Sequence, residues 1–181
     1  MRPVTLFIAV SLDGCLADQE GGVDWLAGQD PAVQDLDTYP EFIREVDTVI
    51  MGWNTYHQVT TQLAPGAWPY GGLTAYVVTH RAPPPAAGVT FTDADPCRLV
   101  RELRETPGRG IWICGGADIV QPLVAEDLIN VYRLSVIPSL LGGGKRLFGP
   151  APEALPLRLT GCREGNGIVE LTYVRRGAVF S

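Results

Sequence analysis

The chain has 181 residues, 46% of them hydrophobic and 19% charged, which is typical of a folded globular protein rather than a disordered one. Its 14 Lys and Arg against 20 Asp and Glu give a net charge of −6, with no basic run, and this argues against a nucleic-acid or anionic-membrane partner. No apolar run reaches the roughly 18–20 residues of a membrane span, and the N-terminus lacks the long apolar region of a signal peptide, so we expect a single cytoplasmic domain over residues 1–181.

The first part of the chain predicts two strands separated by a long loop. The near-continuous apolar run at 3–10 is typical of a central, buried strand. A loop rich in Gly and Asp follows over 11–28, and a helix is expected within 37–46. The second strand is predicted at 47–52, with a short helix after it over 53–62.

The middle of the chain predicts a third strand and a well-delimited helix. The strand covers 73–80, and a proline-rich loop follows at 81–88. Asp95 is placed to cap a helix N-terminus and Pro96 fits the first helical position. Pro107–Gly108 then ends the helix.

The last third predicts one more strand–helix unit and a closing hairpin. In chain order we expect a strand at 111–114, a Gly115–Gly116 turn, a helix to about Glu126, a strand at 128–138, a loop at 139–156 and a hairpin at 157–176 whose turn is EGNG. Strands and helices thus alternate before the hairpin. This order predicts a three-layer α/β/α fold with a central, mostly parallel mixed sheet and an antiparallel C-terminal hairpin.

The cysteines do not suggest a metal centre or a disulfide framework. Cys15, Cys97, Cys114 and Cys162 are far apart and form no CxxC pair, and the chain has only two histidines. We therefore expect no metal site.

Two glycine turns are candidates for ligand binding. Gly52 follows one predicted strand and Gly115–Gly116 follows another, and each turn leads into a helix. A helix N-terminus offers unpaired N–H groups to a phosphate, and glycine lets the backbone come close. The glycines either serve only as tight turns or form a cradle for the two phosphates of a dinucleotide. The GxGxxG fingerprint is absent, so the ordinary dinucleotide-binding fold is not supported.

Four segments in this order resemble the dihydrofolate reductase superfamily. They are IAVSLDGCLA, VIMGWNTY, IWICGGADIVQPLV and VIPSLLGGGKRLF, and they are most similar to the branch that contains the reductase domain of riboflavin biosynthesis and many stand-alone relatives. The resemblance implies a dihydrofolate reductase-like fold. It also implies an NADPH-dependent reductase whose cofactor stretches across the carboxyl edge of the sheet, with a pyrimidine- or pterin-like small molecule as substrate.

The resemblance also implies the roles of individual residues toward the cofactor. These are Ala9 and Leu16 at the nicotinamide carboxamide; Gly52, Trp53, Asn54 and Thr55 at the pyrophosphate; Thr79, His80 and Arg81 beside the adenosine ribose; and Gly115, Gly116, Ala117, Asp118 and Ile119 under the nicotinamide and pyrophosphate. It further implies a cis peptide bond between Gly115 and Gly116. Trp53 stands where the family commonly has an arginine, so Arg81 and His80 are the candidates to neutralise a 2′-phosphate and favour NADPH over NADH.

The substrate side is expected to need a proton donor. In the folate enzymes an acidic residue lies on the helix before the segment that corresponds to VIMGWNTY. Here Asp35 and Asp37 are the candidates for that catalytic role. Trp25 matches an aromatic position at the junction of cofactor and substrate. Asp13 is interpreted as a turn-forming aspartate. A second hypothesis is a nucleotide-binding regulatory protein that has lost catalysis, and a homodimer is considered for either.

Overall fold

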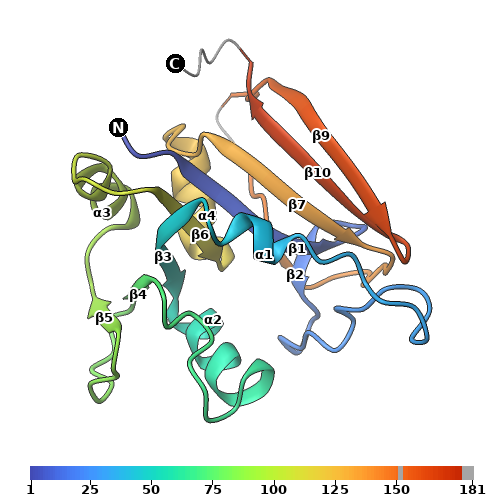
Figure 1. The fold of residues 1–181 in the computed structure, drawn as a ribbon, viewed down its shortest axis with the longest axis horizontal. Helices are drawn as coiled ribbons and strands as arrows, with labels where there is room; N and C mark the ends of the chain where they lie inside the picture. Colours follow the sequence, from blue (N-terminus) through green and yellow to red (C-terminus); the bar gives the residue numbers. More distant parts are fainter. Residues whose placement is uncertain (151–152, 177–181) are drawn as a thin grey trace.

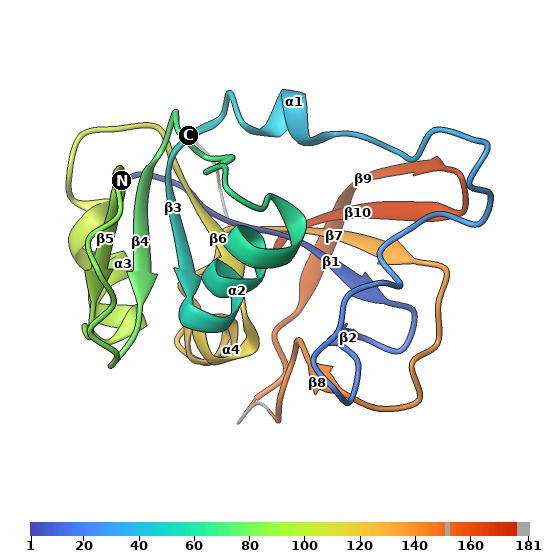
Figure 2. The ribbon, with the colours of Figure 1, turned by 90° about the horizontal axis from the view of Figure 1, so that it is seen from below.

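The computed structural model describes residues 1–150 and 153–176, and its described part has three layers. Residues 151–152 of the loop predicted at 139–156, and residues 177–181 of the expected domain, lie outside the described residues. Helices cover both faces of a central sheet (Figures 1 and 2). The strands of this sheet are β1 (Val4–Ser11), β3 (Val46–Gly52), β4 (Thr74–Val78), β5 (Val89–Thr92), β6 (Gly110–Gly115), β7 (Val131–Ile137), β9 (Leu157–Gly165) and β10 (Ile168–Arg175).

The sheet is mostly parallel, as the sequence predicts. Its strand order within the described residues is β5-β4-β3-β6-β1-β7-β10-β9. Every neighbouring pair from β5 to β7 is parallel, and β10 and β9 add antiparallel strands at one edge. The hairpin turns at Asn166 and Gly167, whose φ angles of 51° and 76° suit the left-handed turn that joins two antiparallel strands tightly. The predicted fold class is confirmed.

Each face of the sheet packs against its own pair of helices. α3 (Pro96–Arg104) and α4 (Ala117–Ala125) cover one face, where Ile111 and Ile113 of β6 join the core. α1 (Tyr39–Phe42) and α2 (Trp53–Gln58), which continues as the π-helical turn η1 (Val59–Leu63), lie on the other face with Trp112. The cap of α3 is as predicted, because the Asp95 carboxylate accepts the N–H of Arg98 at 2.9 Å.

A second, two-stranded sheet occurs where the sequence predicts only loops. β2 (Cys15–Ala17) pairs with β8 (Lys145–Arg146), and the two segments are far apart in the chain. Gly144 permits this approach: its φ is +126°, and an added Cβ would lie 2.1 Å from the Ala17 carbonyl oxygen. Local sequence patterns carry no signal for such a contact, because it depends on the tertiary fold.

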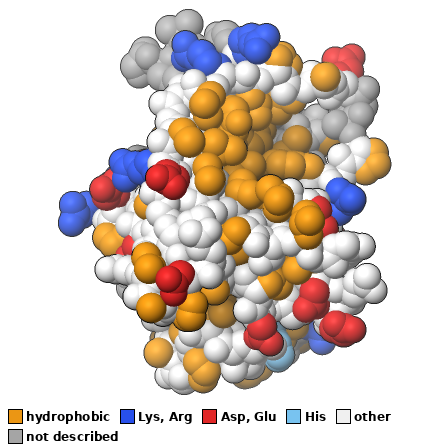
Figure 3. Space-filling model, turned by 90° about the vertical axis from the view of Figure 1, so that its right-hand side faces the viewer, with side chains coloured by type: hydrophobic (Ala, Val, Ile, Leu, Met, Phe, Trp, Pro, Cys, Tyr) orange, Lys and Arg blue, Asp and Glu red, His pale blue; other side chains and the backbone are white. Residues whose placement is uncertain are grey.

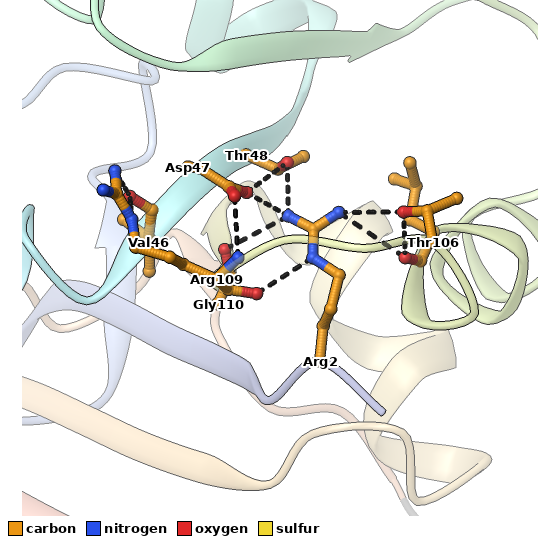
Figure 4. A network of polar contacts seen from close by, with 8 residues as sticks. Arg2, Val46, Asp47, Thr48, Thr106, Arg109 and Gly110 are labelled. Atoms are coloured by element: carbon orange, nitrogen blue, oxygen red, sulfur yellow. Dashed lines mark hydrogen bonds and ion pairs between the residues drawn. The ribbon is translucent and has the colours of Figure 1, made fainter.

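A polar network ties the strands together at their amino-terminal ends (Figure 4). Arg2 is buried, at 7% exposure, and its guanidinium pairs with Asp47, donates to Thr48 Oγ1 at 2.6 Å and donates to the carbonyl of Arg109 at 2.9 Å. The backbone N–H of Arg109 donates to Asp47 at 2.7 Å. Burial by itself raises the pKa of Asp47, but these hydrogen bonds and the charges of Arg2 and Arg109 lower it overall. The network fixes the relative position of β1, β3 and β6.

The C-terminal hairpin presents an apolar surface. Hydrophobic side chains gather on one face of the molecule, on the side of the hairpin (Figure 3). Paired residues such as Leu134 and Leu171 point to the same side of the sheet. The half-buried or exposed apolar side chains on this side of β7, β10 and β9 are Leu134, Val136, Leu157, Leu159, Cys162, Val169, Leu171 and Tyr173. We call this surface the hairpin face.

Candidate functional site

A groove with a volume of about 2150 Å³ runs along the carboxyl ends of β1, β3, β4 and β6. This is the edge at which open α/β sheets bind their ligands. Every residue that the sequence assigns to the cofactor lines the groove except Gly115, which lies directly before the lining residue Gly116. The structure therefore brings together segments that span most of the chain.

The two glycine turns lie side by side at the middle of the groove. An added Cβ on Gly52 would meet Ile119 at 3.5 Å and the Gly116 nitrogen at 3.8 Å, and one on Gly116 would meet Thr55 Oγ1 at 3.6 Å. Gly52 is the N-cap of α2 and Gly116 is the N-cap of α4. The first N–H groups of both helices lack helical partners, so two positively polarised backbone ends meet at one place.

Both the backbone conformation and the neighbouring side chain require a glycine at position 115. Its φ is +112°, and an added Cβ would lie 2.8 Å from Ile8 Cδ1. The peptide bond between Gly115 and Gly116 is cis, as the resemblance implied. Because Gly52 and Gly116 have no side chains, the space above them stays open. We call this space the cradle. It would allow a dinucleotide phosphate to approach the backbone N–H groups.

At one end of the groove, Arg81 lies over Trp53. The Arg81 guanidinium is 5.4 Å from the centre of the Trp53 ring, and the N–H of Arg81 donates to Thr79 Oγ1 at 3.0 Å. The Trp53 ring packs in turn against Tyr56 and Phe91. Trp53 therefore supports the positively charged Arg81 guanidinium at this end of the groove through a cation–π contact. His80 is exposed beside it.

The small β2–β8 sheet forms another wall of the groove. Lys145 pairs with Asp118 at 2.8 Å, and both line the groove. Among the described residues, Arg81 and Lys145 are the Lys and Arg side chains on the groove surface. The wall is anchored by Asp13, which accepts hydrogen bonds from Ser11 Oγ at 2.6 Å and from the Gly142 N–H at 2.9 Å. The hydrogen bond from Ser11, followed by those from the N–H groups of Leu141 and Gly142, lowers the pKa of Asp13 to about 2.

The opposite end of the groove has aromatic walls and neutral polar groups. Trp112 packs edge-on against Tyr70, with ring centres 5.0 Å apart, and lies 5.9 Å from Tyr39. The Trp112 indole N–H donates to the carbonyl of Phe7 at 2.9 Å. Cys114, two residues beyond Trp112, faces the same side of the sheet, and its thiol adjoins the Tyr70 hydroxyl closely enough for each group to affect the pKa of the other. We call Phe7, Tyr39, Tyr70, Trp112 and Cys114 the aromatic end of the groove.

A buried ion pair supports the aromatic end from beneath. Arg133 lies 5.1 Å from the centre of the Phe7 ring and pairs with Glu170 at 3.1 Å. Glu170 also accepts the hydroxyl of Thr38, the residue before Tyr39. These contacts fix Phe7 and the start of α1 on the sheet.

The predicted acids and Trp25 lie in the irregular segment between β2 and α1. Asp35 lines the groove, but it is exposed and accepts hydrogen bonds from the N–H of Gly28 at 3.2 Å and from Asn166 at 2.5 Å. Asp37 is exposed outside the groove lining and accepts the N–H of Tyr39 at 3.1 Å. Trp25 is half-buried, also outside the lining, and donates to the Gly22 carbonyl at 3.2 Å. Their assigned roles stay predictions.

The aromatic end was missed by the sequence reasoning, although part of it had a signal. Trp112 and Cys114 alternate on the strand that enters the Gly115–Gly116 turn, so both must face the ligand edge on one side of the sheet. Tyr70 lies in an irregular segment before β4, and no local pattern places it there. Within residues 1–150 and 153–176, no cluster of three or more His, Cys, Asp and Glu could hold a metal ion. In that same part of the chain, no helix has the length and apolar character needed to cross a membrane.

Known proteins resemble this chain over nearly its whole length, both in sequence and in structure. A relative, the uncharacterized protein YwjB of Bacillus subtilis (strain 168), is 38% identical over 96% of this chain and 98% of its own length. The crystal structure of a candidate riboflavin biosynthesis protein from Shewanella sp. PV-4 is 28% identical, with a TM-score of 0.82 over 96% of this chain and 99% of that one.

Two more distant structures share the fold. A diaminohydroxyphosphoribosylaminopyrimidine deaminase/5-amino-6-(5-phosphoribosylamino)uracil reductase from Thermotoga maritima is 17% identical, with a TM-score of 0.70 over 97% of this chain and 57% of that one. A dihydrofolate reductase from Enterococcus faecalis, in complex with NADP(H), is 15% identical, with a TM-score of 0.66 over 96% of both chains. The fold is therefore dihydrofolate reductase-like. The family model of the RibD C-terminal domain matches residues 2–169, and the chain belongs to that family.

Proposed function

We propose that this protein is an NADPH-dependent reductase that transfers a hydride to a small pyrimidine- or pterin-like heterocycle. The observation that carries the proposal is the contact between the Gly52 and Gly116 turns in a groove lined by nearly all the residues expected to bind the cofactor. The fold is shared with a reductase that was solved with NADP(H). A reduced nicotinamide would supply the hydride, and the protein would bind and orient the two reactants.

The chain offers a distinct set of groups to each part of the cofactor. The N–H groups at the starts of α2 and α4 would hold the pyrophosphate, and Arg81 on the Trp53 ring would meet the 2′-phosphate. Ala9 and Leu16 would contact the carboxamide through their backbones. Lys145, which pairs with Asp118 in this structure, would offset the negative charge of that aspartate beside the phosphates.

The substrate would lie against the aromatic end of the groove. The flat side chains there suit a planar ring, and their polar atoms are phenol and thiol groups. Planar heterocycles pack well against aromatic rings. Because Cys114 directly precedes Gly115, a ring bound here would adjoin the position assigned to the nicotinamide.

One observation favours a second candidate, a nucleotide-binding regulatory protein that has lost catalysis. The predicted acids Asp35 and Asp37 are exposed and occupied by backbone and side-chain donors, so neither is the half-buried carboxylate that a folate-type reductase uses. A protein of this second class would bind NADPH and never oxidise it.

Turnover separates the two candidates. The protein is mixed with NADPH and either 5-amino-6-ribosylaminouracil 5′-phosphate or dihydrofolate, and the loss of reduced-nicotinamide absorbance is followed. Oxidation of NADPH that depends on one of these heterocycles supports the reductase. Saturable binding of NADPH without oxidation by either heterocycle supports the regulatory protein.

A further inference from the structure

The aromatic end of the groove provides hydrogen-bond donors that carry no charge. Apart from the Trp112 indole N–H, which donates to the Phe7 carbonyl, its polar side-chain atoms are the hydroxyls of Tyr39 and Tyr70 and the thiol of Cys114. Asp35 is the carboxylate that reaches this end, and its oxygens are bound to the Gly28 N–H and the Asn166 amide. A reduction here still needs a proton, so a neutral group has to deliver it.

Tyr70 is placed between the groove and a second cavity. That cavity has a volume of about 320 Å³, and Tyr39, Pro69 and Tyr70 line both spaces. Cys114 lines only the groove, and its thiol adjoins the Tyr70 hydroxyl closely enough to affect the pKa of that hydroxyl. The hydroxyl end of Tyr70 therefore lies on the groove side, while its ring forms part of the partition.

The surroundings of Tyr70 favour the protonated form of its hydroxyl. Burial, followed by the nearby Cys114 and Tyr39, raises the pKa of Tyr70 well above its ordinary value. Burial likewise raises the pKa of Tyr39, and it raises that of Cys114 to about 12. All three groups are protonated at neutral pH. A phenol of this kind donates only to an atom that becomes strongly basic, which is what hydride addition creates at the heteroatom of a C=O or C=N bond.

We propose that Tyr70 is the proton donor of the reaction, delivering its hydroxyl proton to the heteroatom of a C=O or C=N group on a flat, uncharged substrate ring or its sugar. This inference rests on the proposed reductase function. The substrate carbon gains a hydride with its two electrons from the reduced nicotinamide, and the π pair moves to the heteroatom. The heteroatom takes the Tyr70 proton. The phenolate recovers a proton from solvent in the groove, so one hydride and one solvent proton are consumed.

The competing donors are separated by a set of matched variants. Tyr70→Phe removes the hydroxyl and keeps the ring against Trp112, and Tyr56→Phe removes a hydroxyl from a tyrosine outside the groove lining. With 5-amino-6-ribosylaminouracil 5′-phosphate and dihydrofolate as probes, Tyr70→Phe is expected to lower kcat by at least about 100-fold. Its affinity for NADPH should stay at the wild-type value, and Tyr56→Phe should behave as wild type.

The pH profile distinguishes a phenol donor from a carboxylic acid. With Tyr70 as donor, wild-type kcat stays flat from about pH 5 to about pH 9, because the phenol remains protonated throughout. A carboxylic acid donor would make kcat fall as the pH rises through its pKa. A falling profile that Asp35→Asn removes, together with normal turnover by Tyr70→Phe, would overturn the proposal.

A binding experiment without cofactor adds a readout that does not depend on turnover. Lumazine, a neutral ring with carbonyl oxygens, is titrated against the tryptophan fluorescence of each variant. Tyr70→Phe should weaken lumazine binding by about 2- to 10-fold through the lost hydrogen bond, and equal binding would contradict the proposal. Failure of the wild type to bind NADPH, or binding of NADPH without reduction of either probe, would reject the reductase itself, whereas normal turnover by Tyr70→Phe in an active enzyme would reject only the role of Tyr70.

Discussion

Gly116→Ala tests the phosphate cradle with a single methyl group. The φ of Gly116 is −78°, a value that alanine adopts readily. The nearest atom to the added Cβ is Thr55 Oγ1 at 3.6 Å, which is an ordinary van der Waals contact. We therefore expect the variant to fold with a free energy of unfolding within about 1 kcal/mol of the wild type.

The same methyl group would lie where the cofactor phosphate has to approach. Displacing the phosphate weakens two charge-assisted hydrogen bonds at the starts of α2 and α4, each of about 1.5 kcal/mol. The expected loss is about 3 kcal/mol in total, or about 100-fold in the dissociation constant of NADPH. Gly52→Ala is the matched variant on the facing turn, because its added Cβ also meets only ordinary contacts.

Isothermal titration with NADPH and urea unfolding measure the two effects separately. A normal unfolding curve with affinity reduced by about 100-fold supports the cradle. Affinity within threefold of wild type, in a variant that is normally folded, would show that the cofactor phosphate does not approach Gly116. Gly115→Ala is unsuitable as the primary test, since its φ of +112° and its contact with Ile8 make it destabilising in any case.

The remaining predictions concern specificity, stability and assembly. Arg81→Ala should lower affinity for NADPH about 10-fold or more while sparing NADH, and equal losses for both in fluorescence titrations would contradict a 2′-phosphate contact. Asp47→Ala should cost about 3 kcal/mol in urea unfolding because it leaves the buried Arg2 unpaired, with NADPH affinity unchanged. The stabilising contribution of Asp47 is present at neutral pH and is lost as the pH falls through its lowered folded-state pKa. We propose that the hairpin face joins two copies of the chain: Leu134→Glu should convert a dimer to monomers in light scattering, and a monomeric wild type would reject the proposal.

The overall architecture could be predicted because its signals are local. The apolar run that became β1, the Asp95–Pro96 helix start and the Asn166–Gly167 turn each specify their own element. The β2–β8 pairing could not be predicted, since it depends on two distant loops and on the close approach at Gly144. The edge strand β5 was not predicted either, because its four residues follow a proline-rich loop and show little periodicity.

Part of the candidate site could likewise be predicted from local sequence, and part could not. The glycine turns could be found because Gly115–Gly116 interrupts a strand just before a helix, and the family resemblance added the other segments. The aromatic end could not be assembled, because Tyr70 comes from an irregular loop and meets Cys114 only in the folded chain. Asp35 and Asp37 were chosen for their position before β3. In the structure their carboxylates are engaged by Asn166 and the Tyr39 N–H at the margin of the groove.

The proposed function requires the groove to bind a nicotinamide dinucleotide. Titration calorimetry of NADPH into the wild-type protein tests it most directly. We expect saturable binding of one NADPH per chain with a dissociation constant in the micromolar range, and weaker binding of NADH. Absence of binding at millimolar NADPH, by a protein that unfolds cooperatively, would contradict it.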